Sequence, residues 1–159
     1  MLRAAVGANS LQSVPSVDLK RYMGLWYEIA RYPNRFERKC DSNVTATYTL
    51  RSDGKVGVVN ACRTREGKLK QSNGWAKVVD RKTGAKLKVT FFWPFFGDYW
   101  IIDLSPDYAY AVVGEPSRKY LWILSRTSEM GDQLYAEITG RLAAKGYDAT
   151  KLQRGRQTE

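Results

Sequence analysis

The chain has 159 residues, a formal net charge of +10, two cysteines and no histidine. The lack of histidine excludes a Ser-His-Asp triad and the histidine-containing zinc sites, and two cysteines cannot supply a four-thiolate site. We therefore expect no metal and no cofactor. The length suits one domain with its own core, and no apolar run is long enough to span a bilayer.

The basic charge has three possible explanations: an anionic membrane partner, a nucleic-acid partner, or an ordinary solvated basic surface. A nucleic-acid binder usually shows an exposed aromatic platform or a recognised RNA or DNA motif, and this sequence shows neither. We therefore expect no nucleic-acid partner. The membrane and the solvated surface both remain open.

Residues 1–15 are expected to form a flexible N-terminal segment. Their only cation is Arg3, and the apolar stretch Ala4–Val6 is too short for the core of a signal peptide. The chain is therefore either cytosolic or the product of a leader's removal.

The main signal from Trp26 to Arg126 is a period-two alternation interrupted by turn residues, which is typical of antiparallel strands. The candidate strands are Gly24–Glu28, Ser42–Leu50, Val56–Cys62, Gly74–Val78, Leu87–Phe91, Tyr99–Leu104, Tyr108–Val113 and Lys119–Arg126. Eight strands joined in order by short loops favour an all-β fold, an eight-stranded antiparallel up-and-down barrel. Tyr99–Leu104 and Tyr108–Val113 are apolar on both faces, so the pattern does not assign their inward face.

The period changes after Arg126. Met130, Leu134, Ile138 and Leu142 recur every four residues, which predicts an amphipathic helix from Asp132 to Lys145, stopped at Gly146. Its apolar stripe should pack on the outside of the barrel. The main domain is expected over residues 16–153, and the polar tail 154–159 is expected to fray.

Trp26 in the first strand and Arg126 at the end of the last are placed to stack as a cation–π pair, which would clamp those strands together. A sheet whose first and last strands meet is a closed barrel without free edges. The Gly24-x-Trp26 motif and the late Arg126 resemble the lipocalin signature, and the likeness is nearest to bacterial, outer-membrane lipocalins related to apolipoprotein D.

This resemblance implies several structural roles. Gly24, Trp26 and Arg126 would seal the closed end of the barrel, and Asp107 and Tyr108 match the family's second motif as a further closed-end brace. The segment Val17–Met23 would cross the same end. The resemblance also implies export, so we expect the periplasm or outer membrane rather than the cytoplasm.

The two cysteines, Cys40 and Cys62, flank one hairpin-like segment. The residues alone leave open whether they are two buried thiols or a disulfide. Cysteines at these two places also occur in the bacterial lipocalins, so the resemblance implies a Cys40–Cys62 disulfide.

The barrel interior is the expected ligand site, because an eight-stranded barrel is just wide enough for one small ligand. The predicted wall consists of Val44, Ala46, Tyr48, Val56, Val58, Gly74, Ala76, Val78, Leu87, Val89 and Phe91. Ala46, Gly74 and Ala76 are small and would leave room. The alternative is that these side chains simply meet in a packed core. Together with the family resemblance, the wall predicts binding, storage or transport of a fatty acid, a lysophospholipid or a similar lipid, without catalysis.

The loops at one end of the barrel form a basic and aromatic rim. Its cations are Arg35, Arg38, Lys39, Arg63, Arg65, Lys68 and Lys70, and its aromatic residues are Trp93, Phe95 and Phe96. These aromatic side chains would either dock on an anionic membrane or fold inward as a lid.

Glu28 lies in the first strand beside Trp26 and could face inward. A buried carboxylate needs a partner, such as a tyrosine, an arginine or a ligand head group. The rival function is a lipocalin-type enzyme that acts on a bound lipid through Cys62, which would require Cys62 to be a free thiol.

Overall fold

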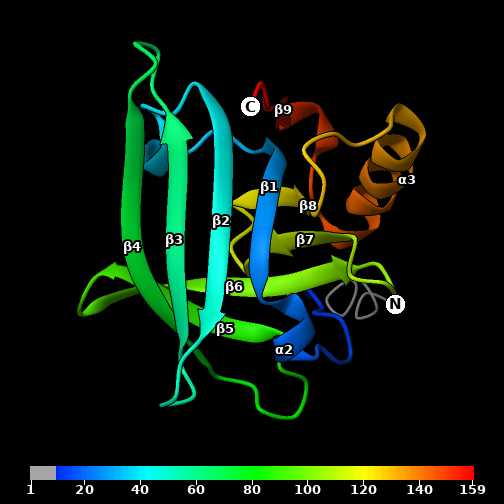
Figure 1. The fold of residues 1–159 in the computed structure, drawn as a ribbon. Helices are drawn as coiled ribbons and strands as arrows, with labels where there is room; N and C mark the ends of the chain where they lie inside the picture. Colours follow the sequence, from blue (N-terminus) through cyan, green and yellow to red (C-terminus); the bar gives the residue numbers. More distant parts are fainter. Residues whose placement is uncertain (1–9) are drawn as a thin grey trace.

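The computed structural model describes residues 10–159, and these form a β-barrel with one helix beside it (Figure 1). The barrel strands are β1 (Gly24–Arg31), β2 (Ser42–Leu50), β3 (Val56–Arg63), β4 (Leu69–Val78), β5 (Lys86–Phe92), β6 (Phe95–Leu104), β7 (Tyr110–Gly114) and β8 (Leu121–Ser125). The helices are α2 (Leu19–Tyr22) and α3 (Asp132–Leu142), with 3-10 turns at Arg35–Glu37, Ala143–Lys145 and Ala149–Lys151. A short strand, β9 (Gln153–Arg154), follows near the C-terminus.

The barrel is closed because β1 pairs antiparallel with both β2 and β8, while β2 to β8 pair in sequence order. Gly24 lies opposite Tyr48, and Tyr27 lies opposite both Thr45 and Ser125. The predicted eight-stranded up-and-down barrel is confirmed. By strand direction, one end holds the connections before β3, β5 and β7, and the other end holds the connections before β2, β4, β6 and β8. We call these the closed end and the open end.

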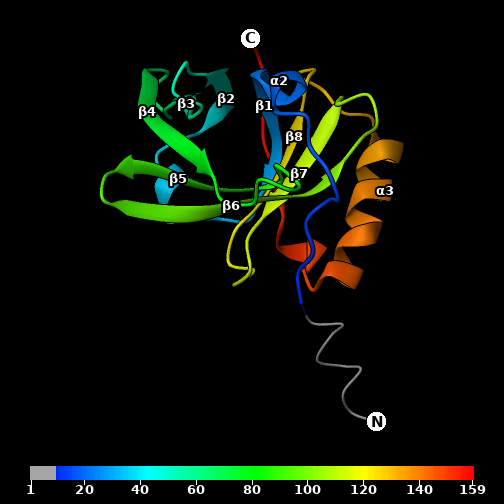
Figure 2. The same cartoon turned by 90° about the horizontal axis from the view of Figure 1, so that it is seen from below.

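The core has two layers, one inside the barrel and one between the barrel wall and α3. The outer layer joins Val112 of β7 and Ile123 of β8 to Ile138 and Leu142 of α3, and Figure 2 shows α3 alongside the barrel, outside it. The predicted helix position is thus confirmed, with the last turn in 3-10 form and Gly146 ending it at a positive φ of 83°.

These two layers explain the strands that are apolar on both faces. Ala111 and Val113 of β7 lie in the inner layer, whereas Val112 lies under α3. In β6 the ordinary alternation places Ile101 in the inner layer and Ile102 in the outer layer, and a register shift relative to β7 lies between Ile101 and Asp103. The inward face could not be assigned from the pattern, because the helix buries the outward face as well.

The N-terminal segment crosses the closed end of the barrel. Val14 N–H donates to Ile101 O at 2.9 Å, and Val17 N–H donates to Thr83 O at 2.7 Å. Asp18 caps α2 by accepting from Lys20 N–H. Of the segment expected to be flexible, residues 1–9 lie outside the described residues. Leu11 is buried, so the expected flexibility does not extend to that position.

The C-terminal tail differs from the expectation of a frayed end. β9 pairs with β1, and beyond it Gly155 N–H donates to Ile29 O at 2.8 Å. Gln157 donates to the backbone oxygens of both Glu28 and Val44, at 3.1 and 2.9 Å. The tail thus bridges β1 and β2 just beyond the end of their direct pairing. Backbone oxygens of these two strands accept hydrogen bonds from the tail, and this holds it in place despite its polar composition.

The aromatic segment after β5 also differs from the prediction, which placed a rim loop there. β5 continues to Phe92 and β6 begins at Phe95, so only Trp93 and Pro94 form the turn. This hairpin projects from the barrel in both views (Figures 1 and 2). Phe92, Trp93 and Phe95 are 79%, 73% and 77% exposed, so they do not fold inward as a lid in this conformation.

Candidate ligand-binding site

The barrel interior brings together most of the residues predicted to form the wall. Its apolar cluster includes Ala46, Tyr48, Val56, Val58, Ala76, Val78, Leu87, Val89 and Phe91. Val44 is half-buried, next to the C-terminal tail, and is not part of that cluster. The predicted wall is therefore largely one continuous apolar surface contributed by β2, β3, β4 and β5.

Gly74 does not leave the room that its size suggests. A Cβ atom at this position would lie 2.7 Å from the ring of Phe91, so that ring already occupies the space beside the glycine. Gly74 thus allows close packing of β4 against β5. This corrects the expectation that all three small residues open space for a ligand.

Part of the inner cluster keeps accessible surface. Val78, Val89, Phe91 and Tyr99 are half-buried, whereas Trp26, Ile101 and Val113 of the same cluster are fully buried. A hydrophobic ligand would contact the accessible apolar surface of the first group.

Three tyrosines inside the barrel were missed as a group by the sequence reasoning. The hydroxyl of Tyr99 lies 2.8 Å from the hydroxyl of Tyr22 and 2.8 Å from that of Tyr48. Burial raises the pKa of all three phenols, that of Tyr48 to about 12. The three hydroxyls therefore stay protonated at neutral pH.

A second polar group lies toward the open end. The carboxylate of Glu28 is buried and accepts a hydrogen bond from Arg31 Nη1 at 2.8 Å, and the same nitrogen lies 3.4 Å from Glu37 Oε2. Trp122 Nε1 donates to Glu37 Oε1 at 2.8 Å. The pKa of Glu28 is raised well above its ordinary value, mainly by burial and secondly by the negative charge of the nearby Glu37 carboxylate. Arg31 lowers this pKa, but by less than the other two effects raise it. The expected partner of Glu28 is thus an arginine of its own strand.

The disulfide between Cys40 and Cys62 ties the loop before β2 to the open end of β3. The S–S distance is 2.08 Å and the Cα atoms are 5.6 Å apart. These are the only two cysteines of the chain, so neither is a free thiol in this structure. Chemistry through Cys62 would require this bond to be reduced first.

The predicted basic residues lie around the open end. Arg35, Arg38, Lys39, Arg65 and Lys68 are exposed, whereas Arg63 and Lys70 are half-buried. Arg63 is paired with Glu159 of the tail at 2.7 Å. These cations share one end of the barrel, but acidic side chains lie among them.

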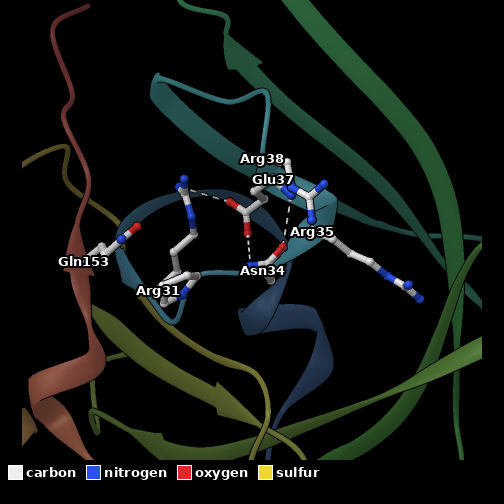
Figure 3. A pocket seen from close by; sticks show the side chains of 7 residues that line it. Arg31, Asn34, Arg35, Glu37, Arg38 and Gln153 are labelled. Atoms are coloured by element: carbon white, nitrogen blue, oxygen red, sulfur yellow. Dashed lines mark hydrogen bonds and ion pairs between the residues drawn. The ribbon is translucent and has the colours of Figure 1, made fainter.

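Two open hollows lie on this rim, and neither includes a predicted wall residue. One, of about 400 Å³, is lined by Arg31, Pro33, Asn34, Arg35, Glu37, Arg38 and Gln153 (Figure 3). In Figure 3 Arg31 points toward Glu37, while Arg35 extends away from this pair. The other, of about 480 Å³, is lined by Arg38, Lys39, Cys40, Asp41, Thr64, Arg65 and Glu66. Both present mixed charges rather than an apolar lining.

The aromatic residues of the rim divide into two groups. Trp93 and Phe95 are exposed at the hairpin tip, together with Phe92. Phe96 instead packs edge-on against Trp75, with the ring centres 5.3 Å apart, and the Lys77 ammonium lies over the Phe96 ring, 4.7 Å from its centre. The exposed apolar tip is therefore formed by Phe92, Trp93 and Phe95.

The residues predicted to have structural roles lie at the closed end. The guanidinium of Arg126 lies over the indole of Trp26, and a Cβ on Gly24 would lie 3.3 Å from that guanidinium. Tyr108 accepts a hydrogen bond from Asp18 N–H at 2.7 Å, and Asp107 accepts one from Ala109 N–H at 3.1 Å. These contacts join the N-terminal segment to the loop before β7.

Two features are absent from residues 10–159. No helix in this part of the chain combines the length and apolar character needed to cross a membrane. No group of three or more metal-binding side chains occurs among the same residues.

Comparison with known proteins agrees with this fold. The profile of the lipocalin-like domain family matches residues 17–157. Temperature-induced lipocalin-1 of Arabidopsis thaliana is 41% identical over 159 residues, covering 95% of this chain and 85% of the relative. The outer membrane lipoprotein Blc of Escherichia coli K12 is 45% identical over 140 residues, covering 87% and 78%. The solved structure of insecticyanin from the tobacco hornworm Manduca sexta aligns with a TM-score of 0.76 at 21% identity, covering 94% and 85%, and shows a likeness of fold.

Proposed function

Because the chain belongs to the lipocalin family, we propose that it binds and carries one small hydrophobic ligand, a fatty acid, lysophospholipid or similar lipid, inside the barrel. The observation that carries this proposal is the continuous apolar inner wall, of which Val78, Val89 and Phe91 remain partly accessible. Burying apolar ligand surface contributes roughly 25 cal/mol per Å² before the costs of association. The proposed role is binding, not catalysis.

The direct test is a titration with a fluorescent fatty acid. The proposal predicts saturable binding of one probe per chain, with displacement by unlabelled fatty acid. A probe whose signal rises without saturation, or is not displaced, would indicate non-specific adsorption and contradict the proposal. Boiled protein and a detergent blank at the same probe concentration serve as controls.

We also propose that the open end docks on an anionic membrane surface in the bacterial envelope. The support is the conjunction of rim cations such as Arg38 and Lys68 with the exposed hairpin tip around Trp93. Each cation near such a surface adds about 1 kcal/mol, and aromatic side chains favour the boundary of the acyl region. Relatives that carry the name outer membrane lipoprotein agree with this location. Docking there would let a lipid enter the barrel without crossing water.

A further inference from the structure

The tyrosine cluster inside the barrel comes from three separate elements. Tyr22 is the last residue of α2, Tyr48 lies near the closed end of β2, and Tyr99 lies in β6. Their hydroxyls form a hydrogen-bonded chain in which the oxygen of Tyr99 lies 2.8 Å from the oxygen of Tyr22 and 2.8 Å from that of Tyr48. The rings of Tyr22 and Tyr48 stack with centres 5.8 Å apart, so the cluster has a defined arrangement.

This cluster has one more donor than its internal hydrogen bonds can use. Each phenol carries one proton, and each hydrogen bond uses one proton. The cluster holds three hydroxyls and two bonds, and among residues 10–159 these hydroxyls have no other hydrogen-bond partner. Whichever way the two bonds run, one O–H is left without an acceptor from the described chain.

A buried donor without an acceptor is unfavourable, because it loses its hydrogen bonds to water and gains none. The cross-strand neighbours of the cluster are apolar: Tyr48 lies opposite Val58 on β3, and Tyr99 lies opposite Leu87 on β5. Tyr99 is half-buried and packs against the inner apolar cluster, so the hydroxyls border the interior of the barrel. An acceptor that enters the barrel would satisfy the remaining donor.

The acceptor that fits is a neutral oxygen. An ionised carboxylate would need a cation beside it in such apolar surroundings. The guanidinium of Arg126 is stacked on Trp26 and donates to the backbone oxygens of Leu25 and Arg21, at 3.0 and 2.7 Å. The hydroxyls stay protonated, so they present a donor and not a charge.

We propose that the Tyr22–Tyr99–Tyr48 cluster receives the neutral carbonyl oxygen of the bound lipid. This inference rests on the proposed function and adds to it the orientation and chemistry of the ligand. The lipid enters with its carbonyl leading, as the ester of a small alcohol or a protonated fatty acid, and not as a lysophospholipid, whose charged head group would have to enter the same apolar end. Its chain extends toward the open end along Val58, Val89 and Phe91. A hydrocarbon without oxygen would leave the donor unsatisfied and bind less well.

The test uses the infrared carbonyl band of methyl palmitate labelled with carbon-13 at the carbonyl. Bound to the full chain, the band should lie at lower frequency than in hexane, because hydrogen bonding weakens the C=O bond. The triple variant Tyr22→Phe, Tyr48→Phe, Tyr99→Phe removes all three donors without changing the ring shapes, and its band should return to the hexane position. The single variant Tyr48→Phe still leaves one unused donor and should keep the lowered frequency.

Affinity provides a second measurement. Wild-type protein should prefer the ester to heptadecane by about tenfold, the effect of one hydrogen bond, and the triple variant should lose this preference. Tyr110→Phe is the matched control, since its hydroxyl accepts from Arg141 outside the barrel, and it should behave as wild type. Circular dichroism checks the fold of each variant.

The possible outcomes separate this inference from the proposed function. An ester that binds wild type with a band at the hexane position overturns the inference and leaves lipid binding in place, as would be found if water occupied the cluster. A lowered band that persists in the folded triple variant also overturns it. If neither the ester nor heptadecane binds, the proposed function fails together with the inference.

Discussion

The guanidinium carbon of Arg126 lies 3.8 Å from the centre of the Trp26 indole ring, which joins the end of the last barrel strand to the first strand. Arg126 also donates to the backbone oxygens of Leu25 and Arg21. One side chain therefore connects β1, the segment before it and the chain after β8. The contact explains why a tryptophan and an arginine a hundred residues apart mark the closure of the barrel.

Replacing Arg126 should destabilise the fold. Arg126→Ala removes the stacking and the hydrogen bonds to backbone oxygens, so the free energy of unfolding should fall by about 1–3 kcal/mol. Urea unfolding followed by tryptophan fluorescence measures the change. Arg51→Ala, which removes only an exposed pair with Asp53, should change stability by less than about 1 kcal/mol. Equal midpoints for Arg126→Ala and wild type would contradict the structural role of the pair.

Filling the interior should weaken ligand binding. Ala46→Trp and Ala76→Trp each place an indole in the inner cluster, where the parent side chains are small. Both variants should fold, with a stability cost of about 1–3 kcal/mol from overpacking, and should bind a fluorescent fatty acid more weakly. Ala136→Trp, on the exposed face of α3, is the control and should bind as the parent does. If both interior variants bind like the control, the ligand lies elsewhere.

Membrane docking should depend on lipid charge, salt and the hairpin tip. In co-sedimentation with vesicles, binding to anionic lipid should exceed binding to neutral lipid and should fall as salt increases. The double variant Trp93→Ser, Phe95→Ser should bind more weakly. Val79→Ser removes an exposed apolar side chain near the closed end and should have no effect. Binding that ignores both lipid charge and salt would rule out electrostatic docking.

Glu28 should make stability depend on pH. Burial raises its pKa in the folded state above the ordinary value of 4.5, so the folded state holds this proton over a range where the unfolded chain has lost it. Its contribution to stability is therefore complete below pH 4.5 and decreases as the pH rises through the folded-state pKa.

Glu28→Gln should remove that dependence. The free energy of unfolding of the variant, relative to wild type, should increase with pH across this window, whatever the constant offset from the lost pair with Arg31. Urea unfolding at a series of pH values measures this slope. Glu66→Gln, at an exposed rim position, should run parallel to wild type. A parallel curve for Glu28→Gln as well would show that the carboxyl is not perturbed by burial.

The sequence predicted the barrel, because alternation and turn residues are local signals that the hydrogen-bonded ladders require. It could not say whether Ile101 or Ile102 faces inward, since the helix covers the outward face and makes both faces apolar. The contacts of the tail were not foreseen for a similar reason. Gln157 is held by backbone oxygens of β1 and β2, and composition carries no information about such distant partners.

The sequence predicted most of the apolar residues of the candidate site, but it did not predict the cluster of tyrosine hydroxyls within it. Alternation identified Val58 and Val89 as inward residues, whereas Gly74 looked like open space because the ring of Phe91 beside it was not foreseen. Tyr22 and Tyr99 carry no motif. Their meeting with Tyr48 follows from the closure of the barrel and from the start of β6 at Phe95, four residues before the predicted start, and no local signal in the sequence indicated it.

Native mass spectrometry of freshly purified protein tests most directly whether the barrel carries a lipid. The account predicts a species with the mass of one lipid added to the chain, released by organic solvent, and regained when a fatty acid is supplied to the stripped protein. Ala76→Trp should carry less of the added mass, while Ala136→Trp should carry it as wild type does. A chain found only at its own mass, which takes up no fatty acid, would contradict the account.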